Sequence, residues 1–397
     1  MLRFKNDDGI DFPDWEEKSF GDFLITHSEK TSDKDSYPLY SLTIESGVQP
    51  KTERYEREFL VKKEGDNYKI VPPNAFVYNP MNLRFGALKV NHEKFSVSVS
   101  GYYDVFSLKD DSTLAFWENY LVTPRMLNYY FSIATGSLIE KLRVHYSQFV
   151  KIKKAVPSFP EQQKIADFLS TIDTVIEKQK ATVEAWEERK KGVMQKLFSQ
   201  EVRFKADDGS DFPDWEEKPF GEIFEKTSNK NTCYGTDKII SVANMYFKDN
   251  ATVSNEDYLK TYNVMLYGDI AFEGNKSKKF LHGRLVANTI GDGIVSHVFD
   301  VFHPINQAVY YLPYWKEYIN YEPVMGRILV RCTKSSTMMT NLVTKDFLKE
   351  TIMVPCLAEQ QKIADCLLAL DDVIEKQKAT LAAWEEMKKG LLQQMFV

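Results

Sequence analysis

Basic side chains gather in two stretches of this 397-residue chain, and several of them neighbour aromatic residues in the sequence. Lysine and arginine neutralise phosphates, and arginine also reads base edges in the major groove, so these stretches favour contact with nucleic acid. The candidates in the first half are Lys51, Arg54, Lys62, Lys63, Arg84 and Lys89. The candidates in the second half are Lys276, Lys278, Lys279, Arg284, Arg331 and Lys334. Taken singly, each is more typical of a solvated surface, and only the set as a whole favours binding.

Motifs for catalysis are absent from the sequence. It contains no phosphate-binding P-loop, no glycine-rich cofactor turn, no nucleophile elbow and no HExxH pair. The cysteines form no CxxC pair, so we expect reduced thiols and neither a disulfide nor a metal site. We therefore expect no catalytic residue and no cofactor in this chain, although an enzyme with an unrecognised site stays an alternative.

Charge is divided unevenly along the chain. The formal net charge is -6, from 51 Lys and Arg against 57 Asp and Glu. Residues 24–160 carry 18 basic against 15 acidic side chains, and residues 224–358 carry 15 against 13. The acidic excess lies in residues 3–23 and 201–223, which carry -4 and -5. Two mildly basic segments are compatible with a polyanionic partner, but they form no concentrated patch in the sequence.

The overall composition is that of an ordinary soluble protein, with 43% apolar residues. The first residues are charged, and no apolar run approaches the roughly 18 residues of a membrane span. Neither secretion nor membrane insertion is expected, which makes the cytoplasm the default location.

The chain consists of two similar halves. The repeated pairs are 161–198 with 359–396, and 3–23 with 203–223. The two pairs recur at nearly the same offset, 198 and 200 residues, which indicates two half-molecules in tandem. The segments between the repeats resemble each other only faintly, so specificity should lie in them.

Both variable segments contain short runs of β-branched and aromatic residues separated by turn residues, a pattern typical of strands. The expected strands are 37–48, 69–80, 85–90 and 95–108 in the first half, and 237–247, 263–275, 284–289 and 293–302 in the second. Residues 123–139 are expected to be helical. The predicted fold class is therefore α+β, with two mixed α/β domains.

Each long repeat has the hydrophobic spacing of a coiled-coil helix, with steps of three and four residues over about four heptads. The first seam is Ile165, Leu169, Ile172, Ile176, Gln179, Val183 and Trp186. The second seam is Ile363, Leu367, Leu370, Ile374, Gln377, Leu381 and Trp384. An amphipathic helix packed on a domain core is the alternative, although a helix of about 38 residues is long for that role.

The length of these helices decides their expected orientation. A helix of about 38 residues spans about 57 Å, whereas a compact domain of about 150 residues is only about 38 Å across. The second variable domain must join the end of one helix to the start of the other, which an antiparallel pair allows. We therefore expect two long antiparallel coiled-coil helices separating the two domains, related by a pseudo-two-fold axis.

This arrangement divides the chain into four parts. The expected globular domains are residues 1–156 and 201–354, and the expected helical parts are residues 157–200 and 355–397. The N-terminal repeat should dock beside the end of the second helix, which brings the termini together. Gln179 and Gln377 should meet near the middle of the seam as a polar pair that fixes the register.

The whole chain resembles the specificity (S) subunits of type I restriction-modification enzymes. The resemblance is carried by EQQKIAD from Glu161 and Glu359, FPDWEEK from Phe12 and Phe212, GDIAFEGN from Gly268, and NAFVYNPMN from Asn74. It implies two target recognition domains, each reading one half of a split sequence in double-stranded DNA, and helices that act as spacers. Because the halves diverge, the target should be asymmetric.

The resemblance also implies partners. The helices would mount two DNA adenine methyltransferase (modification) subunits, and motor-nuclease (restriction) subunits would join for cleavage. S-adenosylmethionine, Mg and ATP would be bound by those partners, so none is expected in this chain. The alternative is a non-catalytic coiled-coil adaptor whose end domains bind protein, which the acidic net charge favours.

Overall fold

The computed structural model describes residues 2–51, 68–138, 141–249, 256–275, 277, 280–335 and 339–396. The chain forms two compact units: unit 1 is Met1–Thr182 with Gln377–Val397, and unit 2 is Val183–Lys376. Each unit combines one globular domain with one part of each long helix, α4 (Phe159–Phe198) and α8 (Leu357–Met395). The four-part division expected from the sequence describes functional parts and stays a prediction. Within the described ranges, no helix is long and apolar enough to cross a membrane.

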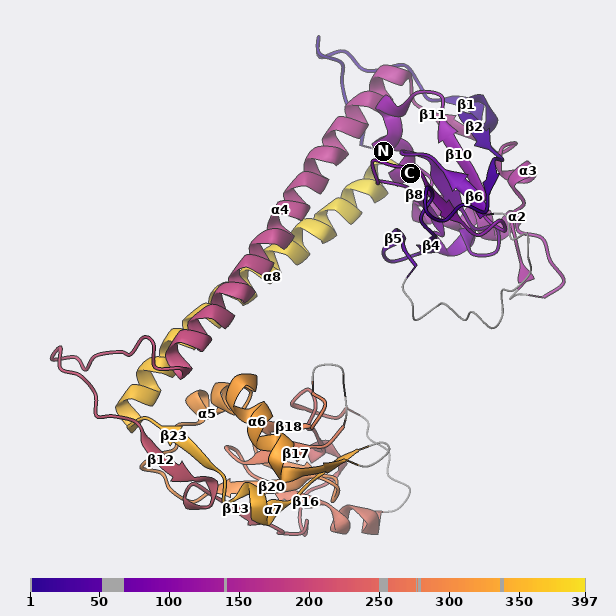
Figure 1. Ribbon diagram of the computed structural model, residues 1–397. Coiled ribbons are helices and arrows are strands. Elements are labelled where there is room, and N and C mark those ends of the chain that lie inside the picture. Colours follow the sequence, from indigo (N-terminus) through magenta and orange to yellow (C-terminus); the bar gives the residue numbers. More distant parts are fainter. Residues whose placement is uncertain are drawn as a thin grey trace. The chain divides into compact units, whose positions relative to one another are not determined.

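The domain of unit 1 contains a four-stranded antiparallel sheet of order β2-β10-β7-β8 (Figure 1). A three-stranded sheet, β3-β6-β9, the hairpin β4-β5 and the pair β1-β11 complete it. The strands are β1 (Glu16–Ser19), β2 (Leu24–His27), β3 (Lys30–Thr31), β4 (Tyr40–Thr43), β5 (Gly47–Pro50), β6 (Tyr68–Val71), β7 (Phe76–Tyr78), β8 (Leu88–Val90), β9 (Val97–Val99), β10 (Asp104–Leu108) and β11 (Lys153–Val156).

The domain of unit 2 repeats this strand order as β13-β20-β17-β18. Its other pairs are β12-β23, β14-β15, β16-β19 and β21-β22. The strands are β12 (Glu216–Pro219), β13 (Phe224–Thr227), β14 (Ile240–Ser241), β15 (Tyr246–Phe247), β16 (Asn263–Met265), β17 (Ile270–Glu273), β18 (Arg284–Ala287), β19 (Gly293–Val295), β20 (Asp300–Pro304), β21 (Thr333–Ser335), β22 (Thr340–Leu342) and β23 (Thr351–Val354). Two domains of one topology therefore underlie the divergent sequences.

Short helices cover each sheet and supply many of the aromatic residues of the core. They are α1 (Leu114–Tyr120), α2 (Pro124–Ile133) and α3 (Tyr146–Phe149) in unit 1, and α5 (Leu312–Tyr318), α6 (Glu322–Cys332) and α7 (Thr344–Phe347) in unit 2. Trp117 of α1 and Trp315 of α5 are buried at the centres of the two cores. Aromatic side chains bury about 150–250 Å² each, so these short helices stabilise the domains far more than their length suggests.

The long helices run antiparallel within each unit. In unit 1, Lys388 Nζ lies 2.6 Å from Asp173, and Gln179 Nε2 donates to Gln377 Oε1 at 2.8 Å. Positions that ascend on α4 thus pair with positions that descend on α8, and the predicted contact between the two glutamines is present. In unit 2, Lys190 Nζ pairs in the same way with Asp371 at 2.8 Å.

The residues of the two seams are covered to different degrees. Ile165, Leu169, Ile172, Ile176, Val183, Ile363, Leu367 and Ile374 are buried. Gln179, Trp186, Leu370, Gln377, Leu381 and Trp384 are half-buried. The most deeply buried positions lie at the helix ends, where the helices also pack against the globular domains.

A buried carboxylate locks the start of each long helix to the preceding repeat. Glu161, which is fully buried, accepts hydrogen bonds from Arg3 Nη2 at 2.8 Å and from Trp15 Nε1 at 3.2 Å. Arg203 and Trp215 hold Glu359 in the same way in unit 2. These two sets of residues are termed the clasps below.

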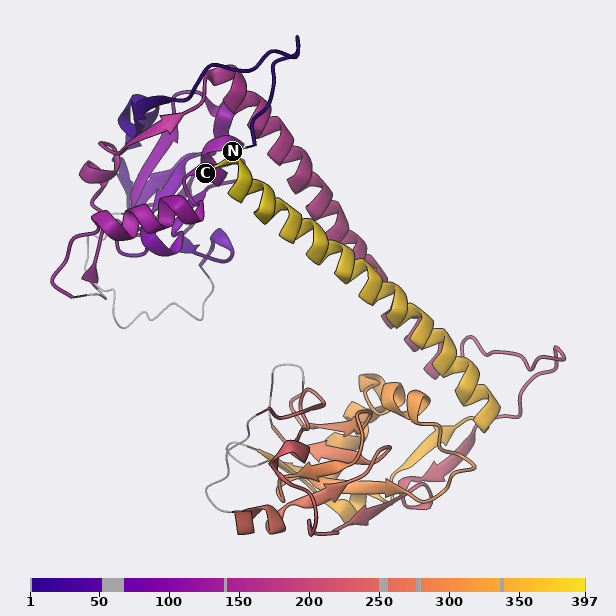
Figure 2. The same cartoon turned by 180° about the vertical axis from the view of Figure 1, so that it is seen from behind.

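The termini lie together in unit 1. The backbone N–H of Leu2 donates to Gln394 O at 2.8 Å, and the ring of Trp15 packs 6.4 Å from that of Phe396. Figure 2 shows both chain ends beside the same globular domain. The predicted docking of the N-terminal repeat at the end of the second helix is therefore confirmed.

Breaking the clasp of unit 1 should destabilise that unit strongly. Arg3→Met leaves the Glu161 carboxylate buried without its cation, which costs about 3 kcal/mol of unfolding free energy. The matched control is Lys5→Met in the same arm, because Lys5 and Asp11 form an exposed pair at 3.4 Å worth less than about 1 kcal/mol. Urea unfolding of the full chain measures both changes, and equal losses would show that the clasp is no stronger than a surface pair.

Candidate nucleic-acid interface

The hairpin of β7 and β8 projects an arginine between two aromatic rings at its tip. Arg84 lies 4.6 Å from the ring centre of Phe85 and 5.6 Å from that of Phe131 on α2. Both rings are exposed, Phe85 at 54% and Phe131 at 56%. Exposed aromatic faces stack on bases, and guanidinium groups contact phosphates or base edges. We name these three residues the tip surface of unit 1.

The fold holds this tip in a defined shape. Asn79 Oδ1 accepts from the backbone N–H of Met81 at 3.1 Å, and Gly86 turns the chain back with a φ of 89°. The segment after α2 is tied to the tip, because the N–H of Val144 donates to Pro80 O at 3.0 Å. The side chains at the tip are thereby carried by a rigid scaffold, as recognition requires.

Unit 2 has the same hairpin with a different tip. The N–H of Thr340 donates to Gly274 O at 2.8 Å, which repeats the tie between tip and return segment. Arg284 lies 4.9 Å from the ring of Phe280, and Leu281 is 65% exposed. Gly283 has a φ of 76°, and a Cβ there would meet Glu273 O at 2.7 Å, so this turn requires glycine.

Half of the predicted DNA-binding residues fall outside the described residues. These are Arg54, Lys62, Lys63, Lys276, Lys278 and Lys279. The other six are distributed over both domains, and only Arg84 belongs to the tip surface of unit 1. Within each unit the described candidates lie on different elements.

Two of the candidates in unit 2 already have carboxylate partners. Arg284 Nε donates to the buried Glu273 at 2.7 Å, and Arg331 Nε donates to Glu350 at 3.0 Å. The hydrogen bond with Glu350 also raises the pKa of Arg331 above its ordinary value. Since these charges are compensated inside the unit, both arginines are weaker phosphate ligands than their sequence context suggests. Lys334, on β21, is exposed.

Lys51 and Lys89 lie near the β4-β5 hairpin of unit 1. Lys51 follows β5 directly, and Lys89 lines a shallow pocket of about 190 Å³ between this hairpin and β8. The carboxylates of Glu93 and Glu118 line the same pocket. The Glu118 hydrogen bond raises the pKa of His92 there. Charges of both signs share the pocket, so it is not a dedicated phosphate site.

Phe131 is the functional candidate that the sequence analysis missed. Met126 and Tyr130 form the buried face of α2, and Phe131 lies beside that face but points to solvent. An apolar residue next to the buried stripe of an amphipathic helix is the signal that could have revealed it.

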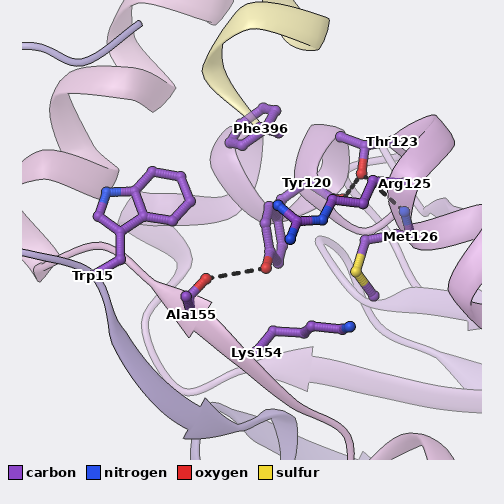
Figure 3. A pocket seen from close by; sticks show the side chains of 8 residues that line it. All are labelled: Trp15, Tyr120, Thr123, Arg125, Met126, Lys154, Ala155 and Phe396. Carbon is purple, nitrogen blue, oxygen red and sulfur yellow. Dashed lines mark hydrogen bonds between the residues drawn. The ribbon is translucent and has the colours of Figure 1, made fainter. Parts of the chain in front are cut away.

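A second hollow in unit 1 lies at the end of α8 and measures about 220 Å³. Trp15, Tyr120 and Phe396 line it together with the basic side chains of Arg125 and Lys154 (Figure 3). Burial and the nearby Arg125 lower the pKa of Lys154. The hollow shares no lining residue with the tip surface. Among the described residues, no group of three or more His, Cys, Asp or Glu is arranged to hold a metal ion.

Comparison with known families decides how these surfaces are to be interpreted. The family described as Type I restriction modification DNA specificity domain matches the chain twice, at residues 13–185 and 213–383. The chain belongs to this family. Each match covers one variable domain and most of the long helix that follows it, so the two specificity domains coincide with the two halves of the tandem repeat.

Relatives with similar sequences are specificity subunits of Methanocaldococcus jannaschii. The type I restriction enzyme MjaVIII specificity subunit is 26% identical over 62% of this chain and 61% of its own length. The putative MjaX specificity subunit is 26% identical over 64% of this chain and 60% of its own length. The chain thus spans about three fifths of the length of the curated relatives that it matches.

Solved structures share the fold over nearly the whole chain. The S subunit of a type I restriction-modification system from M. genitalium superposes with a TM-score of 0.52 at 15% identity, covering 100% of this chain and 98% of its own. A chain solved in work on complex assembly and conformational transition of the type I R-M system gives 0.55 at 13% identity, covering 97% and 98%. At such low identity the likeness concerns the fold.

For a member of this family, the tip surface of unit 1 is expected to contribute to DNA binding. Arg84→Ala should weaken binding of the full chain to its target duplex by about 10- to 100-fold, since one well-placed arginine contact is worth about 1–3 kcal/mol. The matched control is Arg189→Ala, because Arg189 stacks on Trp186 at 5.1 Å but lies on α4. Fluorescence anisotropy measures the affinity of both variants for the duplex. An equal loss of affinity in the two variants would show that Arg84 contributes only its positive charge.

Proposed function

We propose that this protein is the DNA-sequence specificity subunit of a type I restriction-modification complex and is not itself catalytic. The observation that carries the proposal is the double family match, one copy on each of two domains that share a strand order. In this proposal, each domain reads one half of a bipartite target.

The target is proposed to be asymmetric, because the two hairpin tips differ in chemistry. The tip of unit 1 carries an arginine stacked between two exposed rings. At the tip of unit 2 the arginine is paired with a buried glutamate, and a leucine is exposed. Surfaces that differ in donors and apolar groups select different base edges.

The long helices are proposed to form an antiparallel coiled-coil spacer, with a pseudo-two-fold relation between the halves. Two readers on such a spacer contact one face of the duplex when the half-sites lie about one helical turn, roughly 34 Å, apart. The polar pair of Gln179 and Gln377 supports this proposal, since a polar residue in a seam fixes its register.

The catalytic chemistry is proposed to lie on partner subunits. Two DNA adenine methyltransferase subunits would mount on the helices and bind S-adenosylmethionine, while motor-nuclease subunits would use ATP and Mg. This division agrees with the lack of catalytic motifs in the sequence. Double-stranded DNA is then the ligand of this chain itself.

Methylation mapping tests the proposal. The full chain is expressed with its methyltransferase subunit in cells that lack other adenine methylation, and modified adenines are located by sequencing. We expect one split, non-palindromic motif. Exchanging residues 24–156 for those of another specificity subunit should change one half of the motif and leave the other half and the methyltransferase unchanged.

Two results would count against the proposal. A palindromic motif would contradict two dissimilar readers, and a motif that is unaffected by the exchange would contradict reading by the variable domain. The control is the same chain with Arg189→Ala on α4, which should give the unaltered motif.

A further inference from the structure

The start of α4 in unit 1 borders a cavity of its own. Its volume is about 140 Å³. It is lined by Lys18, Asp22, Phe23, Leu108, Lys109, Asp110, Thr113, Trp117, Pro157, Phe159 and Gln162. We name it the α4 pocket. An apolar cavity of about 150 Å³ holds one benzene ring, so the α4 pocket has room for one medium-sized side chain.

Unit 2 shows what fills the corresponding place. Between β20 and α5 the chain has seven residues, 305–311, whereas between β10 and α1 it has five, 109–113. Both connections begin with the same backbone hydrogen bond. In unit 1 the N–H of Lys109 donates to Phe23 O at 2.8 Å, and in unit 2 the N–H of Ile305 donates to Ile223 O at 2.8 Å. The two additional residues bring Val309 and Tyr311 of unit 2 against the start of α8.

This longer segment is bound through its backbone. Val309 O accepts from Trp315 Nε1 at 3.0 Å and from Gln360 Nε2 at 2.9 Å. The N–H of Tyr311 donates to Gln360 Oε1 at 3.1 Å. Tryptophan and glutamine together thus recognise an extended peptide by the carbonyl of one residue and the N–H of the second residue after it.

Unit 1 has the same two side chains without the peptide. Trp117 is 1% exposed and Gln162 is 4% exposed, and both line the α4 pocket. Among the described residues, Trp117 Nε1 donates no hydrogen bond and Gln162 Oε1 accepts none. Gln162 Nε2 donates only to Pro157 O, at 2.9 Å. Neither atom is among the fully buried atoms that lack a partner, and both side chains line the open pocket, so a ligand that enters it can form hydrogen bonds with them.

We propose that the α4 pocket binds an extended peptide segment of the methyltransferase subunit. The segment offers a backbone carbonyl to Trp117 and Gln162, as Val309 does in unit 2, and places one apolar side chain in the cavity. This inference rests on the proposed function, in which that subunit mounts on the long helices. Phe159, at the start of α4, is 49% exposed beside the pocket and provides apolar surface for such a partner.

The rim of the pocket favours a peptide over a nucleic acid. Asp22 and Asp110 line it alongside Lys18 and Lys109, so a phosphate would meet carboxylates as well as ammonium groups. The ammonium of Lys109 is also engaged, since it donates to Asp22 O at 2.8 Å. A peptide backbone is neutral, so the carboxylates of the rim do not repel it. Its N–H and C=O groups can form hydrogen bonds with the amide of Gln162.

The pocket distinguishes the two places at which identical partners would mount. At the start of α8 the chain fills the site with its own residues, whereas at the start of α4 the site is left to the partner. Two copies of one methyltransferase subunit are therefore held unequally, and the copy beside unit 1 has the additional contact.

A loop graft tests this inference. Replacing residues 110–113 of the full chain with residues 306–311 should fill the pocket from within. We expect the melting transition of unit 1 to rise by about 2–4 °C, as for a gain of one or two hydrogen bonds. Binding of one of the two methyltransferase subunits should weaken about tenfold or more, because its two hydrogen bonds are lost. Calorimetry and native mass spectrometry with the purified methyltransferase subunit give both readouts.

A matched pair of point variants keeps the test independent of the graft. Trp117→Phe removes the donor but keeps an aromatic ring, so it should weaken one methyltransferase binding event by about three- to tenfold. Trp315→Phe removes a hydrogen bond within unit 2, so it should lower the melting temperature of unit 2 and leave both binding events unchanged.

The outcomes separate the two proposals. If the unaltered chain binds no methyltransferase subunit, the proposed function fails. If it binds two, and both the graft and Trp117→Phe bind them with unchanged affinity, the α4 pocket is not a peptide site. A graft that lowers the melting temperature of unit 1 would also contradict the inference, since the pocket would then not accept an extended backbone.

Discussion

The two clasps are the interactions on which each unit depends. A carboxylate that is removed from water costs several kcal/mol unless a cation and hydrogen-bond donors surround it. Glu161 is fully buried and obtains them from Arg3 and Trp15, which come from a segment far away in the sequence. The carboxylate can therefore be buried only when the arm, the helix start and the domain core come together. This couples three parts of the unit into one cooperative structure.

The clasp recurs in unit 2 with nearly the same distances, although the chain is connected differently there. Residues 199–202 join α4 covalently to the arm of unit 2, and the N–H of Val202 bonds to Lys196 O at 3.2 Å. In unit 1 the hydrogen bond from Leu2 to Gln394 O brings two separate chain ends into the same relation. Local geometry is thus set by the clasp and the packing around it, and the covalent link is secondary.

The two domains share one strand order and differ in the loops around it, which explains how one topology can recognise two different ligands. The sheet order is the same in both domains, and the tie between the hairpin tip and the return segment recurs. The tips themselves differ in length and in their exposed apolar groups. The connection before α1 is two residues shorter than that before α5. It borders the α4 pocket in unit 1, whereas in unit 2 Val309 and Tyr311 are hydrogen-bonded to Gln360. Small insertions at the edge of a fixed core therefore change what each half can bind.

The sequence predicted which regions contain strands more accurately than it predicted where one strand ends and the next begins. Residues 37–48 were expected to form one strand but contain β4, a turn over residues 44–46 and the start of β5. Gly47, with a φ of 76°, allows the chain to leave this turn. The helix expected at 123–139 ends at Ile133, before Gly136. Helices α1 and α5 were not predicted, since seven residues show too little periodicity; their aromatic residues become informative only through burial in the core.

The tandem repeat, the two long helices and their antiparallel pairing could be predicted from the sequence, because they follow from periodicity and from the reach of the chain. The sequence also indicated the class of protein through motifs that occur twice. Which charges are available became clear from the folded chain, in which Arg284 is paired with Glu273 across a hairpin and Arg331 is paired with Glu350. Only the tertiary structure placed Phe131 beside Arg84 and left Trp117 and Gln162 facing an open cavity. The physical reason is that availability depends on every neighbour in space, whereas a sequence pattern reports only neighbours along the chain.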